Sequence, residues 1–94
     1  MKQSLTEMTE SEIRGLSVPV QALWHAAKGA WDRAHELVQD DGSSNAAWVH
    51  AYLHRVEGDL GNARYWYHRA GKPAVTDMSL DDELQSLITA LAGQ

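Results

Sequence analysis

Two histidines and a glutamate have a spacing that suits metal binding. His50, His54 and Glu57 are separated by four and three positions. On a helix the three side chains would share one narrow stripe, and a histidine pair at i and i+4 can chelate a divalent ion. The spacing is right but incomplete, because a zinc site needs a third and usually a fourth protein ligand. The signature with glutamate directly after the first histidine is also absent, since residue 51 is alanine. These residues remain metal candidates, but the favoured interpretation is a polar helix stripe without metal or cofactor.

Other chemical signals in the sequence are weaker. Residues 64–69 (RYWYHR) alternate bases and aromatics, a composition that can stack nucleobases, but on a helix these side chains point in different directions. The acidic run at residues 81–83 is typical of a helix N-terminus, where negative charge is stabilising. No serine or cysteine nucleophile lies in an identifiable motif, and no glycine-rich phosphate loop is present. The sequence therefore predicts no enzyme activity.

Length and charge set further bounds. The chain has 94 residues, no cysteine and a net charge of −5, which favours one domain held together by packing alone. Four of the acidic residues and no base lie in residues 74–94. Without a basic stripe, nucleic-acid binding is not expected. No apolar stretch suits a signal peptide or a membrane span, so a cytoplasmic protein without membrane contact is expected.

Apolar residues recur at helical spacing, which predicts an all-α fold. The expected helices span residues 18–28, 31 to about 40, 44 or 45 to 57, 61–70 and 80 to about 91, with Ser44 or Asn45 capping the third and Ser79 the last. Three regions follow: a polar, partly flexible segment (1–17) with a short turn at 9–14; two helix pairs (18–41 and 44–71) within residues 18–73; and an acidic linker with an amphipathic helix (74–94).

The two helix pairs are related by an internal repeat. A shift of 29 residues superposes Val20 on Val49, Ala22 on Ala51, His25 on His54, Gly29 on Gly58 and Ala34 on Ala63. Such a unit cannot bury its apolar face until a neighbour stacks on it. The sequence therefore predicts stacked helix pairs, with a packing or hydrogen-bonding role for both His25 and His54.

The second unit resembles a tetratricopeptide repeat. It reads Trp48-x2-Ala51-Tyr52, then Gly58-Asp59-Leu60, then Ala63-x3-Tyr67-x2-Ala70, and the first unit keeps residues 29–34 (GAWDRA). The resemblance implies a right-handed array of about two helix pairs plus a C-terminal capping helix. It also implies that Trp31 and Leu60 fill space between helices. The structural anchors are Gly29, Trp31, Ala34, Trp48, Ala51, Gly58, Ala63, Tyr67 and Ala70.

The resemblance further implies a binding groove along the first helix of each pair. Its residues are Val20, Trp24, Val49, Leu53 and Val56. Because such an apolar surface is a liability when exposed, something is expected to cover it. The nearest candidate is the last helix, with leucines at 84, 87 and 91 and Ile88; a second copy or an apolar partner peptide are the alternatives. The expected function is a non-catalytic protein–protein interaction scaffold, and the alternative is a metal- or small-ligand-binding module using the stripe of His50, His54 and Glu57.

Overall fold

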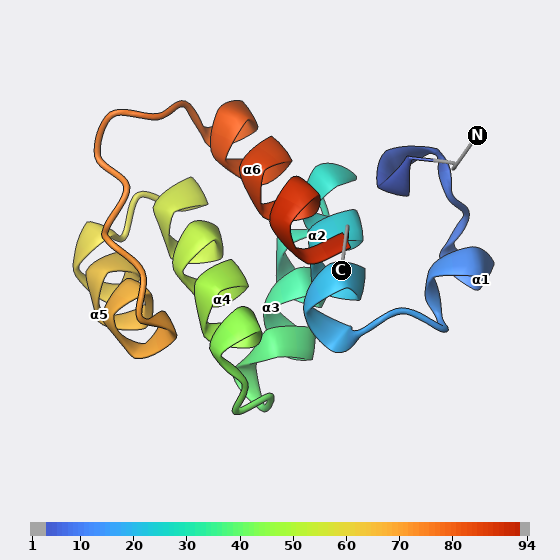
Figure 1. Cartoon of the computed structure of the whole chain (residues 1–94), viewed down its shortest axis with the longest axis horizontal. Helices are drawn as coiled ribbons and strands as arrows, with labels where there is room; N and C mark the ends of the chain where they lie inside the picture. The colour runs from blue at the N-terminus through green and yellow to red at the C-terminus, as the bar shows by residue number, and fades with distance from the viewer. Residues whose placement is uncertain (1–3, 93–94) are drawn as a thin grey trace.

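The computed structural model describes residues 4–92, and this part of the chain is entirely helical apart from connecting segments (Figure 1). The elements are the 3-10 helix η1 (Leu5–Glu7) and the α-helices α1 (Glu10–Ile13), α2 (Val18–Ala27), α3 (Trp31–Gln39), α4 (Ser44–Val56), α5 (Leu60–Ala70) and α6 (Leu80–Ala92). The five long helices confirm the prediction from apolar spacing. Within residues 4–92, none of them has the length and apolar character needed to cross a membrane.

Side-chain caps explain where three helices begin. Ser43 Oγ accepts a hydrogen bond from the Ala46 amide at 3.1 Å at the start of α4. Asp59 caps α5 and Ser79 caps α6 in the same way. The expectation that Ser44 or Asn45 caps α4 is wrong by one residue, because the backbone of Ser43 is still extended and Ser44 is already helical.

The turns within the two helix pairs have matching geometry. Gly29 and Gly58 both have a φ of +81°. After each glycine the next amide bonds back to a histidine carbonyl: Ala30 to His25 at 2.8 Å and Asp59 to His54 at 2.9 Å. The left-handed conformation explains why glycine occurs at these two positions 29 residues apart.

Replacing Gly58 with alanine is expected to lower the free energy of unfolding by about 1 kcal/mol, because a Cβ is strained in the left-handed region. Replacement of Gly61 provides a control, for which the expected change in stability has the opposite sign. It lies inside α5, and a Cβ added there would meet no atom within 4 Å, so Gly61→Ala should raise stability by about 0.5 kcal/mol or more. Urea denaturation measures both; equal effects of the two variants would show that the turn conformation is not what matters.

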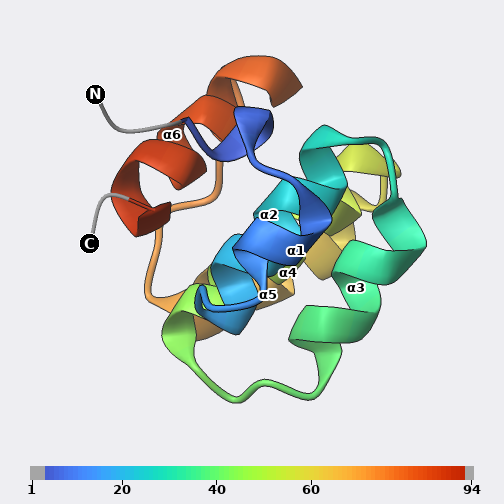
Figure 2. The ribbon, with the colours of Figure 1, turned by 90° about the vertical axis from the view of Figure 1, so that its right-hand side faces the viewer.

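The helices pack around α2 and α4. α4 contacts α3, α5 and α6, while α6 also packs on α2. Figure 2 shows α3 and α6 on opposite sides of α2. The main core includes Val20, Leu23, Val49, Leu53 and Leu87. A smaller cluster of Ala51, Ala63 and Tyr67 joins α4 to α5.

The predicted structural anchors have different environments. Ala34, Ala51, Ala63, Tyr67 and Ala70 are buried. Trp31 and Trp48 are partly buried against the core. Leu60 does not fill space as expected, because its side chain is 54% exposed. It lies at the first position of α5, in the wall of a pocket of about 260 Å³ that Ala63, Tyr67 and residues 74–76 also line.

The segment before α2 also contributes to the core. Leu5 and Ile13 are buried there, within the segment that the sequence predicts to be polar and partly flexible. Side chains of α2 reach the same segment: Trp24 Nε1 donates to the Met8 carbonyl and Lys28 Nζ donates to the Thr6 carbonyl, both at 2.9 Å. Residues 4–17 are therefore joined to α2 by apolar packing and hydrogen bonds; residues 1–3 lie outside the described part.

Candidate functional site

The face formed by α2 and α4 holds the last helix. α6 lies across α2 and alongside α4 (Figure 1), and it packs against both. The buried residues of α6 are Glu83, Leu84, Leu87 and Leu91. The three leucines share one core with residues of α2 and α4. A single apolar stripe of α6 thus covers the apolar face of two helices that belong to different helix pairs.

A buried carboxylate anchors the beginning of α6. Arg55 of α4 donates from Nη1 to Glu83 Oε1 at 2.7 Å, and Tyr67 of α5 donates its hydroxyl to the other oxygen. The second Arg55 amino group donates to the carbonyl of Met78, just before α6. Burial, followed by the hydrogen bond to Glu83, raises the pKa of Tyr67, so the hydroxyl stays protonated and donates. One carboxylate therefore connects α4, α5 and α6.

The five residues of the predicted groove do not share one environment. Val20, Val49 and Leu53 are buried in the core that includes the α6 leucines. Trp24 is partly buried and hydrogen-bonded to the segment before α2. Val56 is 41% exposed at the end of α4, where a small pocket of about 100 Å³ also has Leu53, Trp31 and Tyr52 in its walls.

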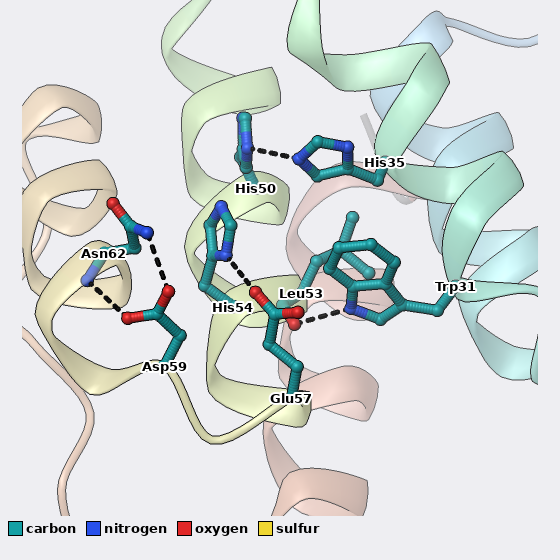
Figure 3. A network of polar contacts seen from close by, with 8 residues as sticks. All are labelled: Trp31, His35, His50, Leu53, His54, Glu57, Asp59 and Asn62. Carbon is teal, nitrogen blue, oxygen red and sulfur yellow. Dashed lines mark hydrogen bonds and ion pairs between the residues drawn. The ribbon is translucent and has the colours of Figure 1, made fainter.

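The histidine stripe of α4 meets a third histidine from α3 (Figure 3). His50 Nε2 lies 3.0 Å from His35 Nε2, and His54 Nδ1 lies 2.6 Å from Glu57 Oε1. One ring nitrogen from each of His35, His50 and His54 lies within 4.8 Å of those of the other two. We call these three residues the histidine cluster. Glu57 contacts only one of them, through the side of the His54 ring that faces away from His50 (Figure 3).

Indole rings enclose the histidine cluster. Trp31 stacks on His35 with ring centroids 4.8 Å apart, and Trp66 stacks on His50 at 3.8 Å. Trp31 is itself fixed, because its Nε1 donates to the Leu53 carbonyl at 2.6 Å. Burial, followed by the neighbouring histidines, lowers the pKa of His50 to about 4. Burial and then the charge of His54 lower the pKa of His35. His35 and His50 therefore favour the neutral imidazole form.

Two features of the site were not predicted. The sequence did not indicate that His35 lies beside the α4 stripe, because it is 15 residues from His50 along the chain. The one available signal was its position four residues after Trp31, on the helix that precedes α4. From the sequence, Glu83 was interpreted only as one of the negative charges that stabilise a helix N-terminus. Its pairing with Arg55 spans 28 residues, and no local spacing indicates it.

Comparison of the chain with models of protein families, with curated proteins and with solved structures finds no match.

Proposed function

We propose that this chain is a non-catalytic protein–protein interaction scaffold of the tetratricopeptide type, whose α2–α4 face binds an amphipathic helix. The observation that carries the proposal is the packing of α6 on this face by one stripe of leucines. α6 serves as the intramolecular ligand. A partner would bind by presenting the same pattern, an acidic residue followed by leucines at the spacing of Leu84, Leu87 and Leu91.

The repeat supports the relation to tetratricopeptide arrays. Gly29 and Gly58 end the first helix of each pair in the same conformation. The small residues Ala34 and Ala63, equivalent under the 29-residue shift, are both buried, which allows helices to approach closely. The first helices of the two pairs, α2 and α4, contact each other, as stacked repeats require.

The connection to α6 supports exchange of this helix. Residues 71–79 contain no helix, and all of them except Val75 are exposed. Proteolysis in such a segment leaves the remaining contacts intact, since tolerated chain breaks fall in exposed loops. α6 could then leave its face without a rearrangement of the other helices.

An exchange experiment tests the proposal. A protease site is inserted after the exposed Asp77, the folded chain is cut, and a labelled peptide of residues 79–94 is added. We expect the labelled peptide to replace the cut fragment under native conditions. The same peptide with Leu87→Ala should compete about 30-fold or more weakly, because Leu87 is fully buried and a leucine truncation in a core costs about 2 kcal/mol or more.

Two outcomes would contradict the proposal. If the cut fragment exchanges only under denaturing conditions, α6 is a permanent part of the core and the face is not a binding site. If the Leu87→Ala peptide competes as well as the parent peptide, exchange does not use the α2–α4 face. Sedimentation equilibrium of the uncut chain identifies the occupant: a monomer is expected, whereas a dimer that dissociates on deletion of residues 79–94 would assign the face to α6 of a second copy.

A further inference from the structure

The histidine cluster has the composition and geometry of a metal site. It brings together one side chain of α3 and two of α4, which lie one helical turn apart (Figure 3). Tetrahedral zinc with imidazole ligands at about 2.0 Å needs nitrogens about 3.3 Å apart. His35 and His50 already meet this spacing with nitrogens 3.0 Å apart, and the widest of the three separations is at most 4.8 Å. His50 and His54 stack nearly parallel with ring centroids 4.8 Å apart, so the His54 ring must rotate before its nitrogen lone pair reaches an ion held between His35 and His50.

The hydrogen bonding within the cluster is unsatisfied. His50 Nδ1 is buried and without a hydrogen-bond partner among the residues that the structure describes, and its Nε2 faces His35 Nε2. Only one of these two Nε2 atoms can carry the proton of a hydrogen bond between them. Whichever ring donates, His35 and His50 together form one hydrogen bond through this pair. An ion bound by Nε2 of both rings would take the place of this shared proton, and the proton of His50 would then lie on Nδ1.

The carboxylate of Glu57 completes the pattern. It accepts from His54 Nδ1, which leaves Nε2 as the free nitrogen, and that nitrogen points toward His50 (Figure 3). A carboxylate on the outer nitrogen of a histidine fixes the tautomer and makes the inner nitrogen a better ligand. Glu57 thus has the position of an outer partner, and His35 supplies the ligand that the α4 stripe lacks.

We propose that His35, His50 and His54 bind one late first-row divalent transition-metal ion, with Zn²⁺ as the representative ion and Glu57 as the outer partner of His54. Three neutral imidazoles favour zinc, nickel or copper over magnesium or calcium, which prefer oxygen ligands. Three protein ligands leave the fourth tetrahedral position to water or to a group from another molecule. The ion would join α3 to α4, and so one helix pair to the other.

Zinc titration of the full-length chain tests the site. After treatment with a chelator and dialysis at pH 7.5, calorimetry with ZnCl₂ should show one ion per chain, and the melting temperature should rise with zinc but not with MgCl₂. Cobalt chloride should give the strong visible absorption of four-coordinate Co²⁺. Because metal ligands must be deprotonated, zinc affinity should fall on acidification.

Three variants identify the ligands. His35→Ala and His54→Ala should each weaken zinc binding at least tenfold, and Glu57→Gln should weaken it about tenfold, as expected for an outer partner. His68→Ala is the matched control, because His68 is an exposed histidine of α5 outside the cluster. It should leave affinity and stoichiometry unchanged. Circular dichroism of each metal-free variant checks that it is folded.

Three results would overturn the proposal: no zinc binding by the parent chain up to millimolar concentration, unchanged affinity in His35→Ala, or an equal loss in His68→Ala. The second would reduce the site to the His50–His54 pair on α4, and the third would indicate scattered surface binding. The cluster and the α6 face share no side chain, so failure here leaves the peptide-exchange experiment unaffected.

Discussion

Replacing Arg55 with alanine is expected to lower the free energy of unfolding by about 3 kcal/mol or more, measured by urea denaturation at pH 7. The side chain of Glu83 is only 3% exposed and that of Arg55 is 14% exposed. Removal of one partner from a buried ion pair leaves the other charge without compensation, and this accounts for the large cost. Tyr67 would still donate to the carboxylate, but a neutral hydroxyl does not replace a guanidinium.

Two comparisons separate the lost ion pair from the lost side chain. Arg64→Ala removes an exposed arginine from α5, and a surface substitution of this kind should change stability by less than about 0.5 kcal/mol. In the double variant Arg55→Met, Glu83→Gln, the amide oxygen can still accept from Tyr67 and no charge is buried. Much of the stability should return. If Arg55→Ala costs no more than Arg64→Ala, the buried pair does not hold α6.

Acidification from pH 7 to pH 4 is expected to lower the free energy of unfolding by about 3 kcal/mol through His50 alone. The folded chain keeps His50 neutral to a pKa of about 4, against 6.5 in the unfolded chain, and each unit of difference corresponds to about 1.4 kcal/mol. Because the unfolded chain binds the proton first, this contribution is complete above pH 6.5 and decreases as the pH falls toward 4. Burial lowers the pKa of His25 and His35 as well, so their contributions have the same sign.

The measurement is a series of urea denaturation curves between pH 7 and pH 4 in chelator. His50→Gln removes the titrating group and keeps a polar side chain of similar size, so its stability should depend less on pH over this range. His68→Gln should retain the dependence of the parent chain. If the free energy of unfolding has the same pH dependence in the parent and in the His50→Gln chain, His50 is not the source of that dependence. This holds whatever the absolute stability of the variant.

The helix positions were predictable because their signals are local. Apolar spacing, the serine caps and the glycines at 29, 58 and 71 each act within one or two turns. The amphipathic stripe of α6 was visible for the same reason. Its place on the α2–α4 face depends on packing between residues more than 30 positions apart, so from the sequence α6 is only one of three candidate occupants.

The differences between the predicted and the observed contacts arise from residues distant along the chain. Glu83 has the position of an ordinary helix-terminus charge, yet Arg55 and Tyr67 surround it. Trp31 and Leu60 are equivalent under the 29-residue shift, but Trp31 donates to the Leu53 carbonyl, whereas Leu60 is 54% exposed in the wall of a pocket beside residues 74–76. A repeat predicts equivalent backbone positions, and it does not predict which of them a neighbouring helix covers.

The stacking of indole on imidazole gives the histidine cluster an optical consequence. Two of the four tryptophans, Trp31 and Trp66, lie face to face with His35 and His50. A protonated imidazole in contact with an excited indole quenches its emission, whereas a neutral ring does so much less. Ultraviolet fluorescence of the native chain therefore reports the charge states of His35 and His50 without dye, tag or substitution, together with that of His25, whose ring contacts Trp24.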